Sequence, residues 1–153
     1  MRIVPSEFSS SAWDYFILSK EIAFNNFQQN VDSENLLLAI IKEDILAREI
    51  LKKNEVDIQT IEKKLLSLLK SKAKMKNKQE TIYIGESLHN IFLKSNDFKV
   101  SFNDVVISTE HLLYGLSYDE VCGKLILNKK SITNFFEIIK KMKSDPTIDK
   151  NSE

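Results

Sequence analysis

Apolar residues return along this chain at spacings of three and four, the period of an amphipathic helix. In the first half the pattern predicts a helix at 12–26, a short helix that Asp32 or Ser33 caps, and helices around 45–51 and 58–69. In the second half it predicts a helix at 87–98, a short helix that Ser108 caps, and helices around 121–127 and 135–142. Each helix has one apolar stripe that needs a partner surface. The pattern therefore predicts an all-α fold.

The order of helices in the second half repeats the order in the first half. "NVDSENLLLAI" at 30–40 aligns with "VISTEHLLYGL" at 106–116, which places Glu34 and Glu110 76 positions apart. The same offset aligns apolar with apolar residues for about 50 residues without a gap, for example Phe16 with Phe92. Such self-similarity indicates an internal duplication. We predict two four-helix copies, at 8–69 and 84–142, packed around a pseudo-twofold axis with no sheet beyond a short pairing of loops.

Composition narrows the function classes. Lys+Arg and Asp+Glu are equal at 22 each among 153 residues, so no overall field steers nucleic acid or an anionic membrane to the protein. The single cysteine permits no intrachain disulfide, which fits a reducing compartment. No apolar run reaches membrane-spanning length, and the start, "MRIVPSEF", lacks the apolar stretch of a secretory signal. We expect a cytoplasmic protein, or one of the plastid stroma or another organelle if a targeting segment was removed, with neither nucleic acid nor membrane as partner.

A lysine-rich stretch separates the two copies. "KSKAKMKNKQE" at 70–80 carries a lysine at every second position from Lys70 to Lys78. A solvated, self-repelling linker is the favoured interpretation, and a weak contact with a polyanion is the alternative. The chain from Ser144 is polar and contains Pro146, which predicts a linker that leads to something else.

The sequence carries little catalytic chemistry. It contains neither a G-x-x-x-x-G-K phosphate loop nor a G-x-G-x-x-G motif. His89 and His111 form no metal-spaced pair with Cys122, which is predicted to be a small core residue. His111 is interpreted as a half-exposed polar residue beside a helix cap. We therefore expect no enzyme activity, cofactor or metal in this chain.

Glu34 and Glu110 lie in the first turns of equivalent helices. A carboxylate there complements the helix dipole, typically by about 0.3–1 kcal/mol. A carboxylate at a helix start beside an apolar groove is also suited to hold a cationic or amide-bearing group of a bound peptide. Both interpretations remain open from the residues alone.

These motifs resemble a known family. The twice-used "[ST]-E-[HN]-L-L" helix start and the four-helix copies look like the Clp repeat domain, the N-terminal module of the Clp unfoldases and disaggregases. "EFSSSAWDYFILSKEIA" at 7–23 resembles the opening helix of the ClpB type. "IYIGESLHNIFLKS" and "VISTEHLLYGLSYDEVCGKLIL" resemble the second copy of cyanobacterial or plastid ClpB. The resemblance covers about residues 7–150.

The resemblance implies a substrate-engaging domain of an ATP-dependent protein disaggregase. Such a domain binds unfolded or aggregated polypeptide, and in some cases adaptor proteins, and delivers clients to its own AAA+ modules in a homohexameric ring. ATP and Mg²⁺ would belong to that parent. In the ClpB type a hydroxyl residue, an aspartate and a glutamate line the substrate groove, which implies Ser9, Asp104 and Glu110 here. In the ClpC type the glutamates of both motifs read phosphoarginine, which implies Glu34 and Glu110, although the first motif reads "DSENLLLA" rather than "GTEHILLG".

The expected organisation follows from the repeat and the resemblance together. Residues 1–7 are an N-terminal tail, 8–70 the first Clp repeat, 71–82 the lysine-rich linker, 83–143 the second Clp repeat, and 144–153 a linker toward a missing ATPase module. Two alternative functions remain. The first is a free-standing accessory protein that regulates a Clp protease complex, and the second is a ClpC-type module that recruits adaptors or phosphoarginine-marked proteins.

Overall fold

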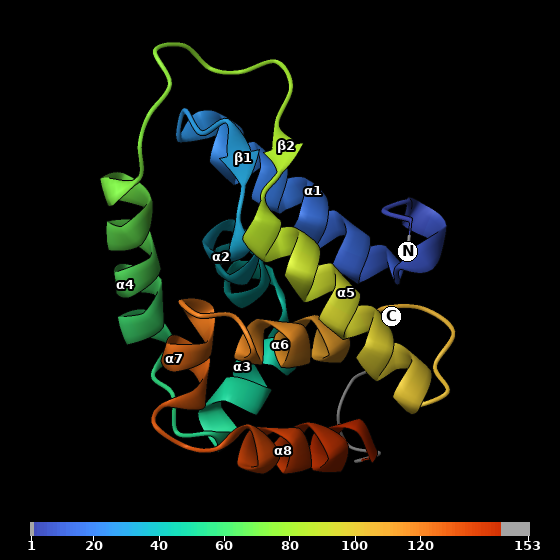
Figure 1. Cartoon of the computed structure of the whole chain (residues 1–153). Helices are drawn as coiled ribbons and strands as arrows, with labels where there is room; N and C mark the ends of the chain where they lie inside the picture. The colour runs from blue at the N-terminus through green and yellow to red at the C-terminus, as the bar shows by residue number, and fades with distance from the viewer. Residues whose placement is uncertain (1, 145–153) are drawn as a thin grey trace.

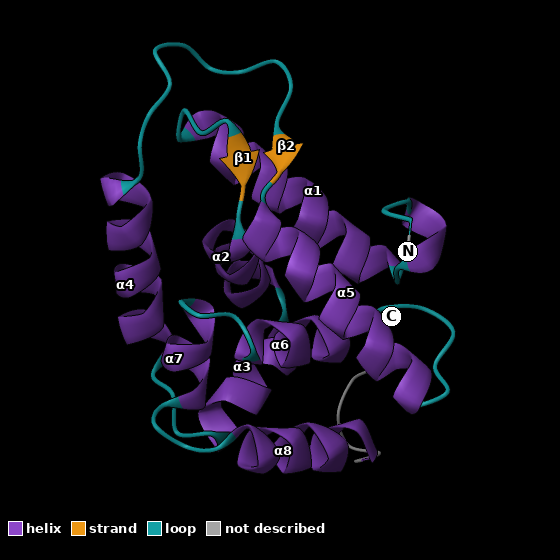
Figure 2. Cartoon of the chain, viewed as in Figure 1, coloured by secondary structure: helices purple, strands orange, loops and turns teal. Residues whose placement is uncertain are grey.

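The computed structural model describes residues 2–144 and is built almost entirely from helices (Figures 1 and 2). The first copy follows a short 3-10 turn, η1 (Pro5–Glu7). Its elements are α1 (Ser10–Asn25), β1 (Asn30–Val31), α2 (Ser33–Glu43), α3 (Ile45–Lys53) and α4 (Ile58–Ser71). The second copy consists of β2 (Tyr83–Ile84), α5 (Glu86–Ser101), α6 (Thr109–Ser117), α7 (Cys122–Leu127) and α8 (Ile132–Ser144). The predicted all-α fold with eight helices is confirmed for the described residues.

Two details differ from the sequence prediction. Helix α5 continues three residues past position 98, because Val100 and Ser101 keep helical backbone bonds until Phe102 caps the end. The predicted N-terminal tail contains η1 and is tied to the second copy, since the Ile107 N–H donates to the Glu7 carbonyl at 2.9 Å. The predicted linker from 144 onward lies outside the described residues beyond Ser144 itself.

Short parallel pairings join the two copies and follow the pseudo-twofold axis. Strand β1 pairs with β2, so that Val31 lies opposite Ile84 (Figure 1). An isolated parallel bridge joins Phe8 to Ile107. Phe8 lies 76 positions before Ile84, and Val31 lies 76 before Ile107, so each pairing is the symmetry equivalent of the other. The predicted short pairing of loops is confirmed.

The two copies share one hydrophobic core. The rings of Phe8 and Phe16 each meet the fully buried Phe92 edge to face, with centroids 5.3 Å apart. Trp13 is half-buried and packs on the same aromatic group, 5.5 Å from Phe8. The amide of Asn54 at the end of α3 donates to the Ile126 carbonyl of α7 at 2.7 Å. Neither copy therefore encloses its apolar stripes by itself.

Helices α2 and α6 lie in the middle of the molecule, surrounded by the other helices (Figure 1). Gly115 lets α6 approach α5 closely, because a Cβ at this position would lie 2.7 Å from the Ile91 carbonyl.

Cys122 is buried at the start of α7, as predicted, and burial raises the pKa of its thiol. No helix within residues 2–144 is both long enough and apolar enough to cross a bilayer.

Candidate functional site

The two repeated motifs form matching capping boxes at the starts of α2 and α6. Asp32 caps α2, and its own N–H donates to the Asn35 side-chain oxygen at 2.9 Å. Ser108 caps α6, and its N–H donates to Nδ1 of His111 at 2.8 Å. Each box satisfies backbone donors that a helix start leaves without intrahelical partners. The first role of the motif is therefore structural, because it fixes the start of each helix and with it the positions of Glu34 and Glu110.

A second residue supports each box from the preceding loop. Gln28 exchanges two side-chain hydrogen bonds with Asn35, at 2.9 and 3.0 Å. Asp104 lies 2.7 Å from Nε2 of His111. Gln28 and Asp104 are 76 positions apart, as are Asn35 and His111, so an amide pair in the first copy replaces an acid–imidazole pair in the second.

The structure corrects the interpretation of His111. Its side chain is fully buried rather than half-exposed, because it is the N3 residue of α6 and its ring turns back to the Ser108 N–H in the capping box. Since Nδ1 accepts the Ser108 N–H, the ring proton sits on Nε2 and is donated to Asp104. Burial lowers the pKa of His111, and the nearby carboxylates of Glu110 and Asp104 offset this only in part.

We expect acid to destabilise the protein through His111. Its pKa in the folded state lies below the unfolded value of 6.5, so its contribution is complete above pH 6.5 and is lost as the pH falls through the folded value. Protonation would place a second donor against the Ser108 N–H. Between pH 6.5 and that folded value, the free energy of unfolding should fall by up to about 1.4 kcal/mol per pH unit from this group.

The measurement is urea unfolding at a series of pH values. The double variant Asp104→Gln with His111→Asn copies the amide pair of the first copy and should lose this slope. The control His89→Asn changes an exposed histidine on α5 and should keep it. Equal slopes in the wild type and the double variant would show that His111 does not control acid stability.

Each motif glutamate is buried and held by a lysine from the end of its own copy. Lys72 Nζ lies 3.4 Å from Glu34 Oε1, and Lys143 Nζ lies 3.1 Å from Glu110 Oε2. Lys143 also contacts Asp104 at 2.9 Å. Partial burial disfavours each ammonium group, but the facing carboxylates outweigh it and raise the pKa of both lysines. Burial likewise opposes ionisation of Asp104, but bonds from Lys143 and His111 lower its pKa.

The structure places the four predicted site residues in two groups. Ser9 caps α1, accepting from the Ala12 N–H at 3.1 Å, and its own N–H donates to the Ile107 carbonyl just before α6. Asp104 and Glu110 share Lys143 beside that helix start. Glu110 Oε1 is buried and has no hydrogen-bond partner among the described residues. Glu34 lies instead in the equivalent group at the start of α2.

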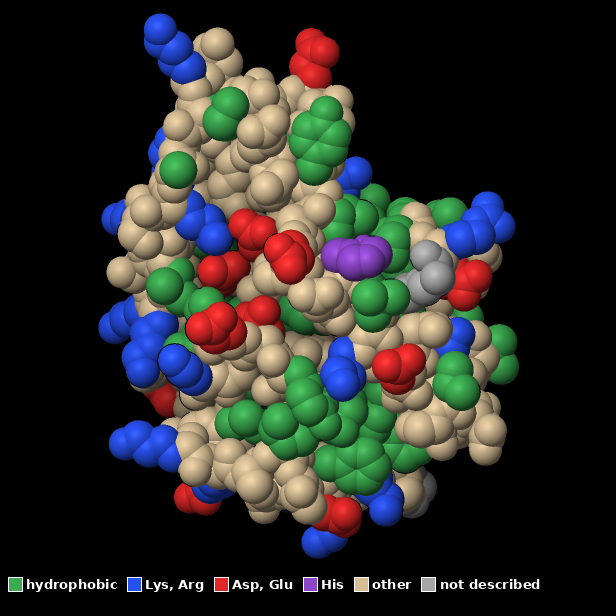
Figure 3. All heavy atoms as spheres, in the orientation of Figure 1, with side chains coloured by type: hydrophobic (Ala, Val, Ile, Leu, Met, Phe, Trp, Pro, Cys, Tyr) green, Lys and Arg blue, Asp and Glu red, His purple; other side chains and the backbone are tan. Residues whose placement is uncertain are grey.

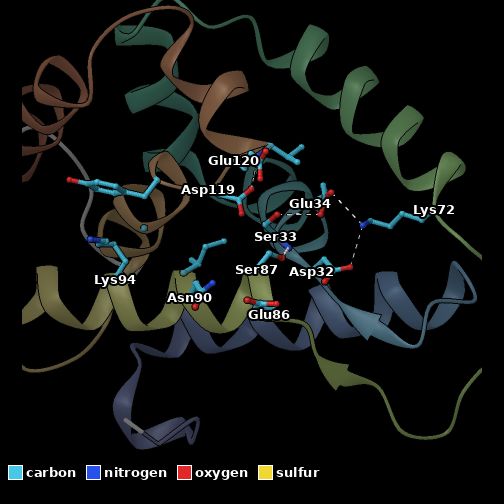
Figure 4. Close-up of a pocket in the computed structure, with 14 residues that line it drawn as sticks. Asp32, Ser33, Glu34, Lys72, Glu86, Ser87, Asn90, Lys94, Asp119 and Glu120 are labelled. Atoms are coloured by element: carbon cyan, nitrogen blue, oxygen red, sulfur yellow. Dashed lines mark hydrogen bonds and ion pairs between the residues drawn. The ribbon is translucent and has the colours of Figure 1, made fainter.

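A groove of about 680 Å³ opens beside Glu34, between the starts of α2 and α5 and the turn after α6. In Figure 4, Asp119 and Glu120 face Glu86 and Asn90 across this space, and Lys72 reaches in from the end of α4. Figure 3 shows the carboxylates gathered in the middle of one face, between the strands and α6–α7. The charged residues of the lining are Asp32, Glu34, Glu86, Asp119, Glu120, Lys72 and Lys94. The acidic residues outnumber the lysines by five to two.

Parts of this lining also serve the local structure. The Ser33 N–H donates to the Ser87 hydroxyl at 3.1 Å and ties α2 to α5. Asp119 accepts a hydrogen bond from the N–H of Cys122, the first residue of α7, at 2.9 Å. A Cβ at Gly85 would fall 2.0 Å from the Asp32 carboxylate, so a larger residue there would have to move the side chain of the α2 capping box. Among residues 2–144, no acidic or histidine group is arranged to hold a metal ion.

The equivalent place beside Glu110 is occupied by side chains. Tyr15 stands where the first groove has Ile91, and Asp44 stands where it has Glu120, each 76 positions away. The Tyr15 hydroxyl donates to Asp44 at 2.7 Å, and the Thr109 hydroxyl donates to the same carboxylate oxygen at 3.0 Å. Tyr15 and Asp44 are both buried. The duplicated fold has therefore kept an open acidic groove at the first motif and joined its elements directly at the second.

Sequence reasoning missed Lys72, Lys143 and the acids of α5 and the α6–α7 turn. The two lysines are not equivalent under the 76-residue offset, so the repeat gave no signal for them. The interpretation of a solvated linker is wrong for Lys72, which is half-buried against two carboxylates, whereas Lys78 is exposed as predicted. The Lys78 ammonium lies 5.3 Å from the ring centre of Phe24 at the end of α1, and aromatic faces attract cations.

Comparison with known proteins agrees with this architecture. The Clp repeat (R) N-terminal domain family matches residues 7–130. The chaperone protein ClpB of Prochlorococcus marinus is 33% identical over 131 residues, which are 85% of this chain and 15% of that protein. The matched part thus spans about a seventh of the length of this relative.

Solved structures show the same fold. The Hsp104 N-terminal domain from Candida albicans superposes with a TM-score of 0.80 at 16% identity, covering 95% of this chain and 97% of that one. A complex of the ClpV N-domain with a VipB peptide superposes with a TM-score of 0.71 at 9% identity, covering 92% and 94%. The chain belongs to the Clp repeat N-terminal domain family, and it is homologous to the N-terminal regions of ClpB chaperones.

Proposed function

We propose that this domain is the substrate-engaging N-terminal domain of a ClpB-type disaggregase in the cytoplasm. It binds unfolded or aggregated polypeptide and delivers it to the AAA+ modules of a hexameric parent, where ATP and Mg²⁺ are bound. Homology to ClpB N-terminal regions supports this role. The structural observation that carries it is the open acidic groove beside Glu34.

The charge of the groove indicates the class of segment that it binds. Five carboxylates face two lysines, and one of these, Lys94, lies over the ring of Tyr118 at 4.3 Å. This lining favours lysine- or arginine-bearing and amide-rich segments through charge-assisted hydrogen bonds. It opposes a phosphoryl group, which brings about −1.5 to −2 charge. Unmodified basic segments are therefore favoured over phosphoarginine.

We propose Ser9, Asp104 and Glu110 as a second contact point for the same polypeptide. The buried Oε1 of Glu110, which has no hydrogen-bond partner within residues 2–144, supports this, because a buried acceptor without a donor costs about 1–3 kcal/mol that a bound amide or ammonium group would recover. The apolar side chains near both contact points add affinity for the client but do not fix its orientation. Binding should be weak, since a disordered client loses its own entropy on docking.

The test is a titration of an unfolded basic model protein against the wild type and single variants. Glu34→Gln should weaken binding about ten-fold, the loss of one charge-assisted contact. Glu110→Ala and Asp104→Ala should each weaken it less, because the pocket beside Glu110 is closed by Tyr15 and Asp44. All affinities should fall as salt is raised, since exposed charges are screened.

Glu21→Gln is the matched control, because it removes the same charge from an exposed position on α1. Its affinity should equal that of the wild type. Equal binding by the wild type, Glu34→Gln and Glu110→Ala, with unchanged melting temperatures, would show that the motif glutamates act only at the helix starts and that clients bind elsewhere.

A further inference from the structure

The groove beside Glu34 already contains a cation that belongs to the chain itself. Lys72 Nζ lies 3.2 Å from Asp32 Oδ2 and 3.4 Å from Glu34 Oε1, and its side chain is 25% exposed (Figure 4). It contacts the same carboxylates that are proposed above to hold a basic client. An arriving lysine or arginine side chain of a client therefore meets an acid pair that is already neutralised in part.

Lys72 is also the first residue of the segment between the copies. It caps the C-terminal end of α4, and the connector (residues 72–82) runs from it to β2. Beyond Lys72, the connector is held by the Met75 N–H, which donates to the Phe27 carbonyl at 2.8 Å, and by Lys78, whose ammonium lies over the ring of Phe24. These two anchors lie three and six positions after Lys72, in the same short connector.

We propose that Lys72 is an intramolecular competitor for the groove, and that a bound cationic segment displaces it and loosens the connector from the end of α1. This inference rests on the proposed function, because it concerns the same groove. Displacement exchanges one cation for another at Asp32 and Glu34, so no carboxylate is left uncompensated in either state. The apparent affinity for a client is the intrinsic affinity multiplied by the fraction of molecules in which Lys72 does not occupy the groove.

The first experiment measures affinity for a defined probe. A blocked, unstructured peptide with spaced arginines and no acidic residue is titrated against the wild type, Lys72→Gln and Lys74→Gln. Lys74 is the matched control, because it removes one charge two positions away, and its Nζ contacts the Leu69 carbonyl rather than an acid. Lys72→Gln should bind roughly five-fold more tightly than the wild type, and Lys74→Gln should bind like the wild type or only slightly more tightly.

The second experiment follows the connector itself by hydrogen exchange of the Met75 amide. Exchange should become faster in the wild type when the peptide is bound, and faster in Lys72→Gln without peptide, but not in Lys74→Gln. Equal affinity of the wild type and Lys72→Gln for the peptide would overturn the competition, and a Met75 amide unaffected by either the peptide or Lys72→Gln would overturn the coupling. A peptide that binds none of the three proteins would instead overturn the proposed function of the groove, and the competition with it.

Discussion

A fragment of residues 1–76 is expected to lose the cooperative unfolding transition of the whole chain. Helices α2 and α3 pack against α5, α6 and α8, and Phe8 and Phe16 close on Phe92 of the other copy. Each fully buried apolar side chain contributes roughly 1.5–3 kcal/mol, whereas a domain of this size retains only about 5–15 kcal/mol in total. Exposing several such side chains in the fragment therefore costs more free energy than the whole domain retains.

The measurement is thermal and urea unfolding of the 1–76 fragment, monitored by far-UV circular dichroism and sedimentation. Mixing it with residues 77–153 should restore helix content and a single transition, because the missing core surface is supplied in trans. A fragment of residues 1–76 that unfolds cooperatively as a monomer would contradict the shared core.

Asp44→Ala is expected to be among the most destabilising single substitutions. Asp44 is 2% exposed and accepts from the Ala47 N–H at 2.7 Å, from Tyr15 of α1 and from Thr109 of α6. Alanine removes a helix cap, typically about 1 kcal/mol, and leaves two buried hydroxyl donors unpaired at about 1–3 kcal/mol each. The free energy of unfolding should fall by roughly 3–7 kcal/mol.

Asp57→Ala is the matched control for this prediction. Asp57 caps α4 by accepting from the Thr60 N–H, as Asp44 caps α3, but Asp57 and Thr60 are both exposed. Its loss in urea unfolding should be much smaller than that of Asp44→Ala. Similar losses of unfolding free energy for both variants would mean that Asp44 stabilises the protein only as a helix cap. Its hydrogen bonds to Tyr15 and Thr109 would then contribute little.

Most of the fold follows from the sequence because the repeat constrains it twice. The apolar spacing predicts each helix, and the 76-residue offset requires its partner in the other copy to have the same place and direction. The pairing of Phe8 with Ile107 is the clearest case, since it repeats the pairing of Ile84 with Val31. The offset also matches the pair Gln28–Asn35 to the pair Asp104–His111, and so identifies the side chains that support each capping box.

The candidate site could be predicted only in part, because its specific features break the repeat. Glu34 and Glu110 are visible in the motifs, but Lys72 and Lys143 reach them from chain segments that are not equivalent. The difference between an open groove and a closed one depends on Tyr15 replacing Ile91 across the core. In the sequence, this difference is only a change from one largely apolar residue to another at a helix position. Its effect on the groove becomes visible only in the packed structure.

Amide chemical-shift mapping shows whether clients dock in the acidic groove beside Glu34. The ¹⁵N-labelled domain is titrated with the unfolded basic protein, and the shifts are followed residue by residue. The largest changes are expected at Ser33, Glu86, Asn90 and Asp119 around the groove, with smaller changes near Glu110. Saturable binding that leaves these four amides unmoved, with the shifts gathered on another face, would contradict the assignment of this groove.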